Sequence, residues 1–273
     1  PSRARTLMSV LQALVLGLVQ GLTEFLPVSS SGHLVLANYF LGWGESFPLA
    51  VDIATNTGTL LAVLVYLRQD VFTAVGGFIR GLGSAEARRG PGWRLALLVL
   101  AGSVPTAVIA LSVKGVFEHL NSPLPVAIAL AVTGFILWFA PRSGPKSEVK
   151  QVTFLDAFIG GLVQGIAVFP GISRSGSTIS ALLARGVDAA LAPRLSFLLY
   201  LVVSFGVAVF GARDVLDADI GTGPLIAMTA SSFVVGYVAL RLVFGLLRRG
   251  KFRLFSPYLW ALSAFTLLRL ALT

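Results

Sequence analysis

The chain has 273 residues, no cysteine and a formal net charge of +9, and 56% of its residues are hydrophobic but only 12% are charged. About 25% charged residues are typical of a soluble domain, so this composition cannot cover a soluble fold of this length. The apolar content excludes a disordered chain, and the lack of cysteine excludes a disulfide scaffold and a thiolate zinc site. The composition therefore predicts a single membrane domain over residues 1–273.

The positive charges form short clusters between apolar segments. Segments 68–94, 142–153, 185–194 and 248–253 hold fourteen of the twenty-one Lys and Arg residues. By the positive-inside rule they are predicted to be cytoplasmic loops in contact with anionic lipid, which places both termini outside. This pattern favours a bilayer over nucleic acid as the partner of the basic residues.

The first element is predicted to be a broken apolar helix. Residues 7–26 are apolar and stop before Pro27, and the polar run 29–33 and the short apolar piece 34–41 follow. A polar break at membrane depth is tolerated only where protein buries it or where it lines a wet cavity. We therefore predict a re-entrant helix–loop–helix hairpin.

Three predicted spans, a second hairpin and three more spans complete the chain. A span needs about 20 apolar helical residues. The second hairpin joins the apolar piece 154–169 to 179–184 through the polar run 173–178. The predicted spans are 49–67, 95–113, 124–140, 191–210, 224–247 and 254–272. The expected fold is an all-α polytopic membrane protein with six transmembrane helices and two re-entrant hairpins.

The two hairpins are similar in sequence. A shift of 144 aligns residues 17–32 with 161–176, with nine of sixteen positions identical. Each hairpin precedes three spans, an odd number, so the second copy would be inverted relative to the first. We predict an inverted-topology repeat with copies over roughly 7–141 and 154–272.

Buried ionisable groups in membrane proteins are costly and are therefore candidates for function. Glu24 lies one helical turn after Gln20, and their oxygen atoms could hold Mg²⁺ or Ca²⁺. The alternative is a carboxyl that caps the next helix or binds loop amides. Asp52, Asn56 and Thr57 could line the same cavity, although structural contacts within their helix are the favoured interpretation.

The run after Pro27 supplies hydroxyls at a helix start, where amide groups and hydroxyls suit an anion. One of Ser29, Ser30 and Ser31 is expected to be a plain N-cap. His33 lies three residues after Ser30 and could exchange a proton with it, although an ordinary polar contact is the alternative. The other histidine, His119, is expected to have no role.

Arg174 is the strongest single candidate. It opens a helix in the second hairpin, and its guanidinium together with the helix amides suits phosphate oxygens. The alternative is an internal salt bridge to Glu24. The hydroxyls around it belong to Ser173, Ser175, Ser177 and Thr178.

These residues together resemble the undecaprenyl-diphosphate phosphatase family, also called bacitracin-resistance proteins. The family motifs are [E/Q]-x-x-x-E followed by P-V-S-S-[ST]-G-H, here at 20–33, and P-G-x-S-R-S-x-x-T, here at 170–178. The resemblance implies a bacterial inner-membrane enzyme with an active site open to the periplasm. It also implies removal of one phosphate from undecaprenyl diphosphate, with a divalent cation, to recycle the carrier lipid of the cell wall.

The family motifs assign roles to individual positions. They imply Glu24, Ser30, His33 and Arg174 as catalytic residues, with Glu24 and Gln20 at the metal. Many members have glutamate in place of Gln20, so Glu24 would carry more of the metal binding here. The nucleophile is either Ser30, with His33 taking its proton, or a water. Expected substrate-binding residues are Ser29, Ser31, Ser173, Ser175, Ser177 and Thr178.

One alternative function uses the same features. Inverted repeats with broken helices also build transporters, so a lipid-phosphate flippase or an anion transporter remains a second hypothesis.

Small-residue pairs such as Gly160 and Gly161 allow close helix packing, which would serve a homodimer as readily as contacts within the chain.

Overall fold

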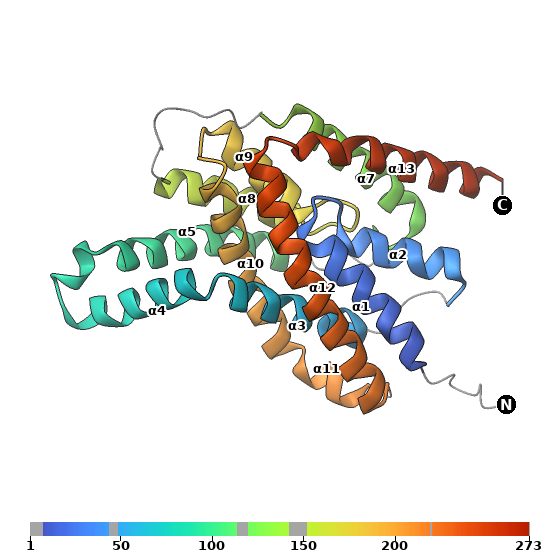
Figure 1. Ribbon diagram of the computed structural model, residues 1–273, viewed down its shortest axis with the longest axis horizontal. Helices are drawn as coiled ribbons and strands as arrows, with labels where there is room; N and C mark the ends of the chain where they lie inside the picture. The colour runs from blue at the N-terminus through green and yellow to red at the C-terminus, as the bar shows by residue number, and fades with distance from the viewer. Residues whose placement is uncertain (1–7, 44–48, 114–119, 142–151, 219, 273) are drawn as a thin grey trace.

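A computed structural model describes residues 8–43, 49–113, 120–141, 152–218 and 220–272 (Figure 1). Regular secondary structure within these ranges is entirely helical, as the sequence predicts. The helices are α1 (Val10–Phe25), α2 (Ser30–Leu41), α3 (Leu49–Tyr66), α4 (Arg68–Gly83), η1 (Ala87–Arg89), α5 (Pro91–Ser112), α7 (Pro123–Phe139), α8 (Phe154–Ile166), α9 (Arg174–Ala184), α10 (Leu191–Phe210), α11 (Ala212–Asp217), α12 (Thr222–Arg248), η2 (Phe252–Leu254) and α13 (Phe255–Ala271).

Several helices are long and apolar enough to cross a bilayer. Among the described residues these are α5, α10, α12 and the helical stretch Phe252–Ala271. A fifth is counted if α3 and α4, which meet at an angle of 79°, form one bent span. The apolar helices α1, α7 and α8 are shorter, at 13 to 17 residues. The protein is therefore an all-helical membrane protein, and the finer arrangement of six spans and two re-entrant hairpins stays a prediction.

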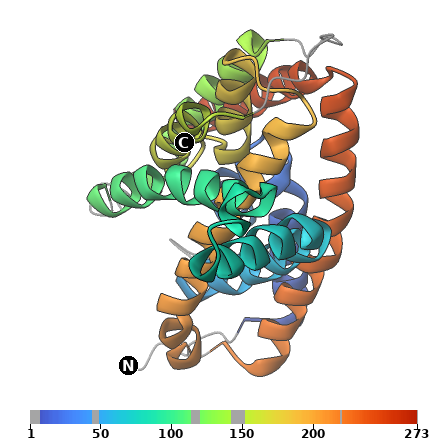
Figure 2. The ribbon, with the colours of Figure 1, turned by 90° about the vertical axis from the view of Figure 1, so that its left-hand side faces the viewer.

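Residues 68–94 are not the loop that their charge predicts. They form α4 and the start of α5, which pack along each other as a hairpin that projects from the body (Figures 1 and 2). The overlooked signal is an apolar stripe at helical spacing, which marks an amphipathic helix despite the charges around it. In the structure this stripe is exposed and consists of Phe72, Val75, Ile79 and Leu82.

Both predicted hairpins form as helix–break–helix units. α1 ends at Phe25, and Ser29 caps α2 by accepting a hydrogen bond from the backbone N–H of Gly32. Ser173 caps α9 in the same way. Asp156 completes a capping box with Thr153 at the start of α8.

The first helix of each hairpin packs on a long helix from the other half of the chain. α1 lies along α12 and α8 along α5 (Figure 1). Glycines at equivalent positions, Gly17 and Gly161, permit these close crossings. A methyl group at Gly161 would overlap the carbonyl oxygen of Gly102, and one at Gly17 would overlap the α12 backbone. The two breaks are thereby held next to each other near the middle of the protein.

Candidate active site

The two helix breaks meet directly. Gly171 has φ +93°, which favours glycine, and its backbone N–H donates to the hydroxyl of Ser29 over 3.1 Å. A Cβ added at Gly32 would lie 3.0 Å from the Cα of Gly171. Residues separated by about 140 positions in the sequence therefore share one site.

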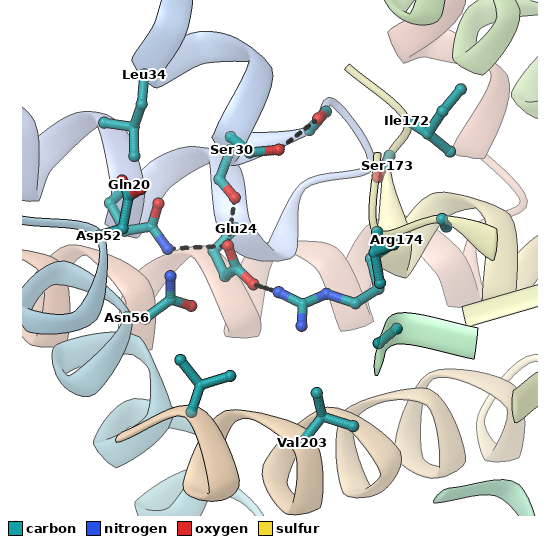
Figure 3. A pocket seen from close by; sticks show the side chains of 16 residues that line it. Gln20, Glu24, Ser30, Leu34, Asp52, Asn56, Ile172, Ser173, Arg174 and Val203 are labelled. Carbon is teal, nitrogen blue, oxygen red and sulfur yellow. Dashed lines mark hydrogen bonds and ion pairs between the residues drawn. The ribbon is translucent and has the colours of Figure 1, made fainter. Parts of the chain in front are cut away.

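A cavity of about 280 Å³ opens beside this junction (Figure 3). Both hairpins line it, and α3 and α10 close its other sides. Its apolar walls include Leu34, Val203 and Val207. Its polar residues are Gln20, Glu24, Ser29, Ser30, Ser31, Asp52, Asn56, Ser173 and Arg174.

Glu24 lies at the centre of the polar contacts (Figure 3). Its Oε1 accepts a hydrogen bond from Nη2 of Arg174 over 2.7 Å, and the pair is an ion pair between the two hairpins. Its Oε2 accepts from Nε2 of Gln20 over 2.9 Å and from the hydroxyl of Ser30. The Glu24 side chain is only 4% exposed, whereas that of Arg174 is 27% exposed. The carboxylate is thus buried and fully paired, and Ser30 directs its proton toward it.

Arg174 is held on a second side by an aromatic ring. Its guanidinium carbon lies 4.9 Å from the centre of the Tyr200 ring, a distance at which cations and aromatic faces attract. Tyr200 is buried on α10, and its hydroxyl lies 3.0 Å from the hydroxyl oxygen of Thr59. The ring therefore orients Arg174 independently of Glu24. Sequence reasoning missed Tyr200, because nothing local connects it to the hairpin.

His33 lies outside the cavity. Its Nδ1 is 2.8 Å from the carbonyl oxygen of Ser29, and its Nε2 is 2.6 Å from the hydroxyl of Tyr258 on α13. The structure therefore does not bring its ring nitrogens to the Ser30 hydroxyl, which bonds to Glu24. Its catalytic role stays a prediction. His119 lies outside the described residues.

The remaining predicted hydroxyls divide into two groups. Ser29, Ser31 and Ser173 line the cavity. Ser175, Ser177 and Thr178 are buried and do not line it, so their contact with substrate stays a prediction.

Two cavity residues come from α3, for which lining the cavity was the less favoured of the two interpretations. Asp52 and Asn56, one turn apart, line the cavity opposite Arg174 (Figure 3). Thr57 does what was expected and donates to the carbonyl of Ile53 over 2.7 Å. The signal in the sequence is the i, i+4 spacing of Asp52 and Asn56, which puts both on one face of the helix.

The donors around the cavity are of the kind that a hard divalent cation prefers, since they are carboxylate and amide oxygens. They come from Gln20 and Glu24 on α1 and from Asp52 and Asn56 on α3. Within the described ranges no three acidic, histidine or cysteine side chains group closely enough to hold a metal by themselves. A cation at this place would therefore also need amide oxygens or oxygens from a bound substrate.

Fold and site together define a class: a helical membrane protein in which a paired carboxylate, a hydroxyl and a guanidinium meet between two broken helices. Residues 13–265 match the family described as bacitracin resistance protein BacA, and the chain belongs to this family. The family resemblance inferred from the motifs is thereby confirmed.

Relatives from several bacteria match over nearly their whole length. The undecaprenyl-diphosphatase of Acaryochloris marina is 59% identical over 97% of this chain and 100% of its own. That of Desulfosudis oleivorans is 42% identical over 95% of this chain and 98% of its own. That of Carboxydothermus hydrogenoformans is 41% identical, covering 94% and 95%.

Proposed function

We propose that this chain hydrolyses undecaprenyl diphosphate to undecaprenyl phosphate and inorganic phosphate, and that Glu24, Ser30 and Arg174 carry the reaction. Family membership and the names of the full-length relatives support the activity. One observation carries the site assignment: Glu24 contacts Ser30 of its own hairpin and Arg174 of the other at the same time. The product would return to cell-wall synthesis as the carrier lipid.

Substrate binding would begin with an exchange of partners at Arg174. The guanidinium is paired with Glu24 but remains partly exposed to the cavity. A diphosphate carries more negative charge than one carboxylate and can be bound by two parallel N–H donors, so it competes for Arg174. Tyr200 keeps the guanidinium in place during this exchange.

The chemical step follows from the hydrogen bond between Ser30 and Glu24. The Ser30 oxygen would attack the terminal phosphorus while its proton passes to the Glu24 carboxylate. The bond from that phosphorus to the bridging oxygen breaks, and undecaprenyl phosphate leaves. Water then attacks the phosphoserine and releases inorganic phosphate. His33 would act on this step through the Ser29 carbonyl that it contacts.

The proposed divalent cation, Mg²⁺ or Ca²⁺, would be held by Glu24 and Gln20, with Asp52 and Asn56 on the facing wall. When bound, the cation would neutralise negative charge on the diphosphate oxygens. Glutamine at position 20 binds a cation through a neutral oxygen, so charge compensation would fall mainly to Glu24.

The proposed location is the bacterial inner membrane, with the site open to the periplasm. The basic segments support it, because they would face the cytoplasm and its anionic lipid. The apolar wall residues Leu34, Val203 and Val207 suit the start of a prenyl chain. Hydrolysis is favoured over transport because a transporter needs no hydroxyl paired with a carboxylate beside its phosphate site.

Phosphate release from detergent-solubilised polyprenyl diphosphate is expected to stop in the presence of a chelator and to return when Mg²⁺ or Ca²⁺ is added back. Free phosphate measures the reaction directly. Release that continues unchanged with chelator would contradict the cation assignment. Failure of the purified protein to release phosphate under any condition would favour the transporter hypothesis.

Replacing Tyr200 by leucine is expected to raise KM for the diphosphate by about 2- to 30-fold, because a cation–π contact contributes about 0.5–2 kcal/mol. Tyr200→Phe keeps the ring and loses only the hydroxyl near Thr59, so its KM should stay close to wild type. Equal KM values in the leucine and wild-type enzymes would show that the ring does not orient Arg174.

A further inference from the structure

The last helix, α13, touches the first hairpin through two aromatic contacts. The rings of His33 and Tyr258 stack with centres 5.7 Å apart and an interplanar angle of 14°. Phe40 and Phe265 lie with ring centres 5.4 Å apart. The two contacts are seven residues apart on each helix, or about two turns, so α2 and α13 face each other along one side. Of the two contacts, only the first includes a hydrogen bond between the partners.

The partners of His33 determine where its proton lies. A carbonyl oxygen can only accept a hydrogen bond, so Nδ1, which is 2.8 Å from the Ser29 carbonyl, must carry a hydrogen. In the neutral ring Nε2 then has a lone pair, which accepts the hydrogen of the Tyr258 hydroxyl over 2.6 Å. The Ser29 carbonyl thus selects the tautomer, and the Tyr258 hydroxyl, which can donate or accept, holds the ring from the opposite nitrogen.

The carbonyl that His33 binds belongs to the most unusual backbone position in the hairpin. Ser29 has φ +69°, and within the described ranges it is the only residue other than glycine with positive φ. Its carbonyl accepts both from Nδ1 of His33 and from the backbone N–H of His33, the latter over 3.1 Å. This carbonyl is part of the peptide group that joins Ser29 to Ser30. The orientation of that peptide sets where the Ser30 hydroxyl points.

We propose that Tyr258 is a positioning residue for the reaction. Its hydroxyl holds the His33 ring at Nε2 so that Nδ1–H stays on the Ser29 carbonyl, and this contact fixes the Ser29–Ser30 peptide so that the Ser30 hydroxyl meets Glu24. Tyr258 does not line the cavity and acts only through His33. The inference rests on the proposed function, since it concerns the same hydroxyl and carboxylate.

The chain contains two histidines, so ¹⁵N-histidine labelling of the purified protein in detergent tests the tautomer directly. The His33→Gln variant identifies the His33 signals by their loss. In the wild type we expect the one-bond N–H coupling on Nδ1 and an unprotonated Nε2. In Tyr258→Phe, which keeps the stacked ring but removes the partner of Nε2, we expect the Nδ1–H signal to broaden and its hydrogen to exchange faster with solvent.

Kinetics then separate positioning from packing. In Tyr258→Phe we expect kcat to fall by about 3- to 10-fold, the effect of one ordinary hydrogen bond, with KM within about twofold. Phe265→Leu is the matched control: it weakens the other contact between α2 and α13 and should keep both the Nδ1–H signal and kcat. If Phe265→Leu lowers kcat as much as Tyr258→Phe does, α13 acts by packing and the proposal is wrong.

Two further results would overturn the inference. One is a wild-type His33 that carries its hydrogen on Nε2. The other is a Tyr258→Phe enzyme with an unchanged Nδ1–H signal or unchanged kcat. Both are distinct from failure of the proposed function, in which the wild-type protein releases no phosphate although its His33 signals can still be read.

Discussion

Phosphate release is expected to fall by about 10²- to 10⁴-fold in Glu24→Gln and by at least as much in Arg174→Ala, the range typical for loss of a positioned acid or base. Glutamine keeps the size of the Glu24 side chain but removes the charge that accepts the Ser30 proton and pairs with Arg174. Alanine at 174 removes the phosphate-binding fork. The measurement is kcat/KM for phosphate release, with folding checked by gel filtration and thermal unfolding in detergent.

The double variant sharpens this prediction. Each single change leaves a buried or half-buried charge without its partner, which costs stability. The double variant Glu24→Gln/Arg174→Ala leaves neither charge unpaired, so it should unfold at a higher temperature than at least one single variant. Residues that act as a unit have non-additive effects, so its activity should be no lower than that of the weaker single variant. Additive losses would show that Glu24 and Arg174 do not act as a unit. Near-normal turnover in one single variant would show that the residue changed in it does not take part in the reaction.

Ser30→Ala is expected to abolish turnover, with a loss of more than about 10³-fold, because it removes the attacking oxygen of a covalent route. The structure directs the Ser30 hydroxyl at the Glu24 carboxylate, which is the arrangement that this route needs. A phosphorylated enzyme should accumulate in wild type when the reaction is stopped rapidly with acid, and mass spectrometry should place the phosphate on Ser30.

Ser31→Ala is the matched control for the loss of a hydroxyl in the same turn. Ser31 also lines the cavity, but its hydroxyl lies 3.4 Å from that of Ser29 rather than at Glu24. We expect it to lower kcat/KM by about tenfold at most, the effect of one binding hydrogen bond. A similarly partial loss in Ser30→Ala, with no phosphoenzyme, would instead indicate a water nucleophile.

Several parts of the fold and site follow from local sequence alone. Helices break where proline, glycine and serine interrupt an apolar run, so the positions of both hairpins are predictable from residue order. Spacing also puts Gln20 next to Glu24 on one helix face, which their hydrogen bond confirms. The serine after each break is available as a cap, and Ser29 and Ser173 take that role. The two motifs are specific enough to indicate the family, which the full-length matches confirm.

Local sequence gives conflicting signals for α4, because its charges predict a loop whereas its apolar stripe at helical spacing indicates an amphipathic helix. The loop prediction relied on the density of charged residues, whereas packing against α5 stabilises the helix. The 79° bend between α3 and α4 has no proline or glycine at the bend, so local sequence carries no signal for it.

The order of residues alone specifies the chemical groups of the site, which are a carboxylate, a serine hydroxyl and a guanidinium. It also specifies the helix breaks beside them, and each of these features can be predicted from the sequence of one hairpin. Which of these groups touch depends on the packing of the whole protein. Glu24 could have held a cation alone or paired with Arg174, and the crossing of α1 on α12 and of α8 on α5 brings the pair together. The same holds for Tyr200 and Asp52, which reach the site from distant helices. Contacts between residues far apart in the chain depend on how whole helices pack, and no local spacing encodes them.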